Sequence, residues 1–231
     1  MTDLTWGGPG DRVAPARRMS PEQRREQLIR VALKLFAEQE PDEVSVDDVV
    51  RAADVSRALF YRYFSNIRDL RLAALRTVVD EVIESITPPD DLDLLGQVRH
   101  SLAGFLDSVE RYAAGYVAVL RTGSTTAPDE SMALVERVRT YIVSLVSTRM
   151  RKQGVIADQL APMFELTLRS WFAIAENASV AWLAEGRIPR DRLESWLLDQ
   201  LTAMLATTAR HDKETALQLA AAIATEGDSS G

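Results

Sequence analysis

Apolar residues recur at intervals of three and four along most of the chain, and no segment alternates apolar and polar residues convincingly as a strand does. Leu28, Ile29, Ala32, Leu33 and Phe36 form one such helical stripe. The pattern predicts an all-α fold. Further helices are expected near residues 45–53, 56–64, 66–86, 94–106, 116–120, 129–152, 156–185, 189–208 and 216–224, the last one weakly packed.

Local start signals divide the first part of the chain into short helices. Ser20-Pro21-Glu22-Gln23 combines a capping serine, a proline suited to the first helical position and a glutamine that completes a capping box. Ser45 and Ser56 are further caps, and Asp47 and Asp48 suit the positive end of a helix dipole. Asp54 lies between two of these helices, where a turn needs a residue that tolerates left-handed backbone.

Composition argues against an enzyme. The chain has no cysteine and two histidines, His100 and His211, so it offers little for a zinc site or a nucleophile–base pair. Glycine-rich phosphate loops and hydrolase motifs do not occur in it, and no cofactor is expected. No apolar run is long enough for a bilayer and the N-terminus does not read as a signal peptide, which favours a cytoplasmic protein.

The charge is unevenly distributed along the chain. The formal net charge is -7, yet residues 1–75 hold 12 basic and 12 acidic residues, so the excess acidity belongs to residues 76–231. Whole-chain charge therefore does not exclude a polyanionic partner for the first part. Residues 1–19 form a basic arm that includes Arg12, Arg17 and Arg18, and residues 226–231 form a polar tail, both expected to be disordered.

The stretch SRALFYRYF, residues 56–64, has two possible interpretations. It is either a solvated amphipathic helix or a surface that touches DNA. Phe60 and Phe64 lie four apart and share a face that can pack on the preceding helix. Arg57 and Arg62 can then donate to guanine edges, and tyrosine hydroxyls can donate to phosphate. Two short helices joined by a tight turn over residues 45–64 also match a helix-turn-helix.

The run SVDDVVRAADVSRALFYRYFSNIRDL, Ser45 to Leu70, resembles the DNA-binding domain of the TetR family of bacterial repressors, and RREQLIRVALKLFAEQE resembles that family's first helix. The resemblance covers roughly residues 20–75. It implies a three-helix DNA-binding domain over 20–66 and a larger helical ligand-binding and dimerisation domain over 67–225. It also implies DNA-contacting roles for Ser45, Arg57, Ala58, Leu59, Tyr61 and Tyr63. Together with the basic arm and the rest of the 56–64 helix, the candidate DNA-binding residues are Arg17, Arg18, Ser45, Ser56, Arg57, Ala58, Leu59, Tyr61, Arg62, Tyr63 and Arg68.

The sequence departs from the family pattern at three positions. Asp54 replaces a turn glycine. Ile67 replaces a lysine that touches phosphate, and Arg68 is the candidate for that role. Asp47 stands where some members read a base, although its place suits a helix-start residue better.

The second domain has a candidate dimer face and a candidate pocket. Phe164, Trp171, Ala175, Ala178 and Trp182 form one stripe on the 156–185 helix, which is either dimer interface, pocket or internal core. The resemblance implies a homodimer through helices 156–185 and 189–208. Candidate ligand-binding residues are Phe105, Tyr112, Tyr116, Tyr141, Phe164, Trp171 and Asn177, with Arg121 and His100 as further polar groups; ordinary core positions are the alternative for the aromatics.

These observations predict a homodimeric repressor that a small, largely apolar molecule releases from a pseudo-palindromic operator. The alternatives are a helical small-molecule-binding protein whose DNA-binding face has decayed, an activator, and a helical enzyme that uses buried carboxylates.

Overall fold

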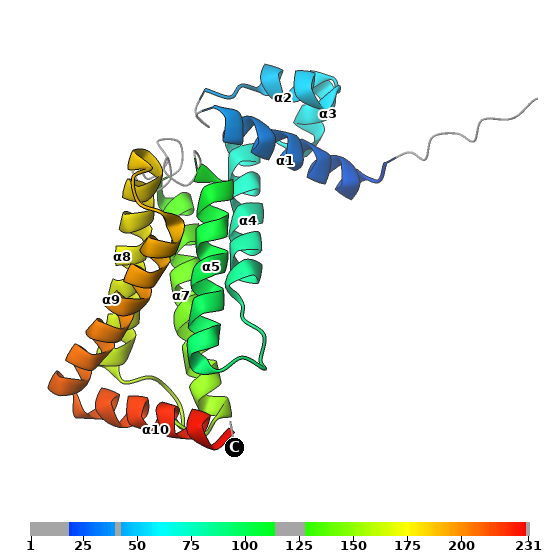
Figure 1. Cartoon of the computed structure of the whole chain (residues 1–231). Coiled ribbons are helices and arrows are strands. Elements are labelled where there is room, and N and C mark those ends of the chain that lie inside the picture. Colours follow the sequence, from blue (N-terminus) through cyan, green and yellow to red (C-terminus); the bar gives the residue numbers. More distant parts are fainter. Residues whose placement is uncertain (1–18, 40–42, 114–127, 230–231) are drawn as a thin grey trace, which may run out of the picture.

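The computed structural model describes residues 19–39, 43–113 and 128–229. In Figure 1 a small group of helices lies across one end of an elongated bundle, and α10 lies across the other end. The predicted residues Arg12, Arg17, Arg18, Tyr116 and Arg121 and the predicted helix near 116–120 fall outside the described ranges.

All regular elements in the described ranges are helices, which confirms the predicted fold class. The small group comprises α1 (Pro21–Glu38), α2 (Val46–Ala53) and α3 (Arg57–Tyr63). The bundle comprises α4 (Ile67–Ile86), α5 (Leu94–Arg111), α7 (Pro128–Lys152), α8 (Pro162–Glu185), α9 (Arg190–His211) and α10 (Lys213–Ser229).

The predicted caps form as expected. Ser20 and Ser45 each make a reciprocal capping box, with Gln23 and Asp48 respectively. Ser56 Oγ accepts the Leu59 backbone N–H at 3.1 Å. Asp54 adopts φ 51° and ψ 54°, the left-handed conformation that the turn between α2 and α3 requires.

The N-terminal helices share one apolar core that includes the start of α4. Leu28, Val49, Phe60 and Leu70 are fully buried in it. Gln27 of α1 donates to the Ala53 carbonyl oxygen at 3.3 Å, which fixes the end of α2 against α1. The short helices α2 and α3 are therefore held by tertiary packing, since helices of their length are marginal alone.

A second core lies between α4, α5, α7, α8 and α9. Its largest buried side chains include Ile86, Leu106 and Leu197. α4 contributes to both cores, so it joins the N-terminal group of helices to the bundle.

Several predicted helix boundaries were wrong. α8 begins at Pro162 instead of residue 156, because α7 ends in a turn at Gly154, with φ +72°, and Pro162 starts a new helix. α10 spans Lys213–Ser229, longer at both ends than the predicted 216–224. It starts earlier because Asp212 caps it by accepting the Thr215 N–H at 2.8 Å. It is also well anchored: Thr215 is fully buried, and the Gln218 side chain accepts the Ala161 N–H at 2.9 Å.

Candidate DNA-binding surface and effector cavity

The helix α3 has one buried and one exposed face. Phe60 and Phe64 are buried, with ring centroids 5.9 Å apart, as their spacing predicted. Arg25 of α1 lies over the Phe64 ring at 5.2 Å, which ties α1 to the end of α3. The exposed face carries the predicted residues Ser56, Arg57, Ala58, Tyr61 and Arg62, while Leu59 and Tyr63 are half-buried.

The Arg57 guanidinium forms a two-point ion pair with the Asp47 carboxylate of α2. Arg57 Nε donates to Asp47 Oδ1 at 2.6 Å, and Nη2 donates to Oδ2. Hydrogen bonding from Arg57 lowers the pKa of Asp47, and Asp47 in turn raises the pKa of Arg57. The sequence does not show this pairing, because Arg57 lies across the turn in the next helix, ten residues after Asp47.

Two other predicted DNA contacts already have partners within the protein. The Ser45 hydroxyl accepts the Asp48 backbone N–H at 3.3 Å and also bonds the Asp48 carboxylate, so it is used in the capping box. Arg68 forms an exposed ion pair with Glu130 of α7, with Nη2 and Oε1 3.3 Å apart. A phosphate contact by either side chain would therefore replace or share an existing bond.

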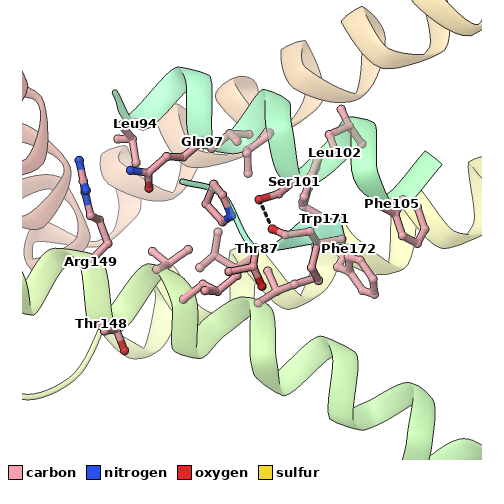
Figure 2. A pocket seen from close by; sticks show the side chains of 18 of the residues that line it. Thr87, Leu94, Gln97, Ser101, Leu102, Phe105, Thr148, Arg149, Trp171 and Phe172 are labelled. Atoms are coloured by element: carbon pink, nitrogen blue, oxygen red, sulfur yellow. Dashed lines mark hydrogen bonds between the residues drawn. The ribbon is translucent and has the colours of Figure 1, made fainter. Parts of the chain in front are cut away.

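The bundle contains a cavity of about 310 Å³ between α4, α5, α7, α8 and α9. Its wall is mostly apolar and comes from five helices. Figure 2 shows Gln97, Thr148 and Arg149 toward one end, and Phe105 and Phe172 toward the other. A cavity of this size and lining suits a small, largely apolar molecule.

The polar groups around the cavity serve mainly to hold its walls. Ser101 Oγ donates to the Ile86 carbonyl oxygen at 2.7 Å (Figure 2), and Trp171 Nε1 donates to the Leu197 carbonyl oxygen at 2.8 Å. Arg149 of α7 donates to the Asp90 and Leu92 carbonyl oxygens at 3.1 and 3.3 Å. These hydrogen bonds fix the loop between α4 and α5 to the end of α7.

Two of the predicted ligand residues, Phe105 and Trp171, line this cavity. The structure places others away from it. Phe164 is buried in the core. Tyr141 does not line the cavity, and its hydroxyl lies 2.8 Å from Oγ1 of the lining residue Thr87. Tyr112 hydrogen-bonds Glu81 of α4, and Asn177 is exposed on α8.

His100, on α5, is half-buried and does not line the cavity. The sequence did not single out most of the apolar lining, because one apolar residue of a helical stripe does not differ from another in sequence. The lining residues missed in this way include Ile86, Leu94, Val98, Leu102, Ile142, Leu145, Val146, Met150, Leu168, Phe172 and Leu201.

The stripe predicted on the 156–185 helix faces inward. Phe164, Trp171 and Ala175 are buried, while Ala178 and Trp182 pack against the same core. The stripe is therefore internal core, and its middle lines the cavity.

A different face of α8 is exposed, with two larger apolar residues at its start, Met163 and Leu166, followed by mostly small ones. Leu166 is 55% exposed there, and Trp196 of α9 is 46% exposed. The exposed residues of this α8 face are Met163, Leu166, Ser170, Ala173, Asn177, Ala181 and Ala184.

A charged network crosses from α7 to α8. Glu176 is buried, and Arg139 Nη2 donates to its Oε2 at 2.5 Å. The Glu136 carboxylate links Arg139 to Arg169: Arg139 Nη1 lies 3.4 Å from Glu136 Oε2, and Arg169 Nη1 lies 2.8 Å from Glu136 Oε1. Burial raises the pKa of the Glu176 carboxyl, although Arg139 opposes that shift.

No helix within the described ranges is long and apolar enough to cross a membrane.

The chain is similar to known regulators over both domains. Residues 28–74 match the family described as bacterial regulatory proteins, tetR family, and residues 94–204 match a tetracyclin repressor-like C-terminal domain. A TetR-family transcriptional regulator from Streptomyces coelicolor is 32% identical, with a TM-score of 0.81 over 90% of this chain and 91% of that one.

Two curated relatives are also regulators. The HTH-type transcriptional activator FasR of Mycolicibacterium smegmatis is 26% identical over 175 residues, 74% of this chain and 77% of that protein. The HTH-type transcriptional regulator HbdR of Aromatoleum is 37% identical over 65 residues, 28% of each protein. These relatives are transcriptional regulators and not enzymes, which agrees with the prediction that this chain is not an enzyme. With its helix-turn-helix and helical second domain, the chain belongs to the TetR family of DNA-binding transcriptional regulators.

Proposed function

We propose that this regulator is a homodimeric repressor that leaves a pseudo-palindromic operator when a small, largely apolar effector binds the cavity. The observation that carries the proposal is the position of the cavity. Ile86, Thr87 and Pro88, at the end of α4, form part of its wall. The other end of α4 begins directly after α3, so one helix connects the cavity with the DNA-binding face.

α4 is tied to its neighbours along its length, which supports its role as a lever. Asp80 pairs with Arg137 of α7 at 2.9 Å, and Arg68 pairs with Glu130 of the same helix. On its other side, Glu81 accepts the Tyr112 hydroxyl of α5. A shift of α5 or α7 around a bound molecule would therefore move α4 and α3 with it.

The mechanism is a population shift between two spacings of the α3 helices in the dimer. Recognition helices must lie one DNA turn apart, about 34–36 Å, to reach successive major grooves. An effector that binds a wider-spaced state more tightly lowers the DNA affinity by its differential binding to the two states. A tenfold loss of operator affinity needs about 1.4 kcal/mol of such a difference.

The exposed faces of α8 and α9 support the dimer. The small exposed side chains of α8 allow a second pair of helices to approach closely, and the larger apolar residues Leu166 and Trp196 would be covered. The proposed dimer interface is therefore a four-helix arrangement of α8 and α9 with their copies from the partner subunit.

On the DNA side, the exposed α3 residues would face the major groove. Arg57 and Arg62 would supply base or phosphate contacts, and Tyr61 would supply a phosphate contact. The exposure of these side chains supports a protein that binds DNA, and not the alternative of a small-molecule-binding protein that has lost DNA binding.

Three measurements test the proposal. Binding of the full chain to the DNA upstream of its own gene is measured by fluorescence anisotropy at low and at physiological salt. Light scattering gives the mass of the protein, alone and on DNA. A reporter gene under the bound promoter shows whether the protein lowers or raises expression. A repressor lowers it; higher expression would instead indicate an activator, like the relative FasR. The proposed function would be wrong if the protein were a monomer both alone and on DNA, or if it did not bind the operator at low salt.

A further inference from the structure

The first turn of α2 presents two carboxylates beside a helix that would face a polyanion. Asp48 is accounted for: it completes the Ser45 capping box, and Arg51 lies 3.3 Å from it. Asp47 takes no part in the cap. Its carboxylate is used by Arg57 of α3, on the face proposed to enter the groove.

The geometry of this pair leaves a defined edge of Arg57 open. Asp47 occupies the edge formed by Nε and Nη2. The N–H groups of Nη1 and the outward N–H of Nη2 form the second fork of the guanidinium. That fork matches the O6 and N7 acceptors of guanine in the major groove. Arg57 can therefore donate to a guanine while Asp47 still holds it.

Asp47 also disfavours contacts between Arg57 and DNA phosphates. A long, unrestrained arginine can turn to the nearest phosphate, which adds affinity without sequence information. The Asp47 carboxylate cancels the charge of Arg57 locally and repels phosphate. The pair thus lowers the affinity for DNA of arbitrary sequence and favours the neutral acceptor edge of a base. Repulsion of phosphate in this way increases the selectivity for sequence.

We propose that Asp47 is a positioning residue that holds Arg57 for one guanine in each operator half-site and thereby sets the base preference there. The inference rests on the proposed function, in which α3 lies in the major groove. A purely structural role is a weaker account, because the two side chains are 61% and 48% exposed and exposed ion pairs add little stability. The turn between α2 and α3 is already fixed by Asp54 and by the bond from Val55 N to Val50 O at 3.0 Å.

The experiment is a selection from random-sequence duplexes, made with the full-length protein, D47A, R57A and the double variant. E43A is the matched control, because Glu43 is an exposed carboxylate of the same domain. Wild type and E43A are expected to select the same guanine in each half-site. D47A and R57A are expected to lose that preference by roughly tenfold or more, the discrimination of a bidentate contact. The double variant should lose no more than R57A alone, because both changes remove one contact.

A second measurement reads the contact directly. Replacing the selected guanine by 7-deazaguanine removes the N7 acceptor, and it should weaken wild-type binding by roughly tenfold but leave R57A unaffected. D47A should bind random duplexes more tightly than wild type, with a steeper dependence on salt. Unchanged thermal melting of D47A separates the result from misfolding.

The outcomes separate the inference from the proposed function. If the wild type selects an operator and D47A retains its guanine preference, the inference is overturned while the regulator remains. An R57A variant with the wild-type base preference overturns it as well. If the wild type selects no sequence at low salt, the proposed function itself fails.

Discussion

Gly104 of α5 lies directly against the backbone carbonyl of Ser85 in α4, so closely that a methyl group at Gly104 would come within 2.1 Å of the Ser85 oxygen. The Ser85 hydroxyl lies 3.2 Å from the Gly104 carbonyl oxygen and 3.1 Å from Ser108 Oγ. The two helices therefore meet backbone to backbone near the end of the proposed lever, at a position that only glycine fits.

Replacing Gly104 by alanine is expected to force α4 and α5 apart and to destabilise the fold by about 3 kcal/mol, at the upper end for overpacking. Chemical denaturation measures the loss. Gly96→Ala is the control in the same helix, because its methyl would meet the side chain of Asp93 instead of a backbone. Equal stability of the two variants would contradict the close helix contact.

The buried Glu176 predicts a pH-dependent variant. Arg139→Met removes the guanidinium from a buried carboxylate, which costs about 3–5 kcal/mol at neutral pH. Burial raises the pKa of Glu176, so the folded state holds its proton more tightly than the unfolded state, and the stability of the variant should increase as pH falls.

Urea denaturation of Arg139→Met and wild type at pH 7.5 and pH 5 measures this difference. The penalty should shrink at the lower pH, because protonation neutralises Glu176. The double variant Arg139→Met, Glu176→Gln should recover most of the stability at pH 7.5. A penalty that is the same at both pH values would show that the lost interaction is not electrostatic.

A larger side chain in the cavity should block the effector without disturbing DNA binding. Val98 lines the cavity, and Val98→Phe would fill part of its volume of about 310 Å³. The variant is expected to bind operator DNA as wild type does, but to stay bound at effector concentrations that release wild type. Anisotropy titrations with apolar compounds measure this; Leu95→Phe, on the exposed side of α5, is the control.

Charge on the exposed face of α8 and α9 should separate the dimer. Leu166→Glu combined with Trp196→Glu places carboxylates where the partner subunit is proposed to pack, and buried unpaired charges are costly. Sedimentation velocity should then give a monomer at micromolar concentration. Leu217→Glu on α10, where the leucine is 62% exposed, should remain a dimer. A dimer in both variants would place the interface elsewhere.

Tyr61, at 53% exposure, should contact phosphate and not a base. Tyr61→Phe removes one hydroxyl and is expected to weaken binding about fivefold, close to the worth of one hydrogen bond. The loss should be the same for the operator and for a random duplex. A loss confined to the operator would instead make Tyr61 a reader of sequence.

Local signals in the sequence were sufficient for the helix-turn-helix. The caps at Ser20, Ser45 and Ser56 join residues three apart, and the left-handed turn at Asp54 is a property of one residue. The burial of Phe60 and Phe64 follows from helical spacing alone. These features depend on neighbours in sequence, so they were predictable without knowing how the helices pack.

Tertiary structure alone decided which side chains meet across helices. Asp47 reaches Arg57 across the turn, and Arg139 reaches Glu176 from another helix; neither pair has a spacing that marks it in the sequence. Phe105 and Trp171 line the cavity while Phe164 lies in solid core, although all three are aromatics on apolar stripes. Helical periodicity specifies a buried face, but the relative rotation and crossing of the helices, set by contacts such as Gly104 on Ser85, decides whether that face meets a neighbour or a cavity.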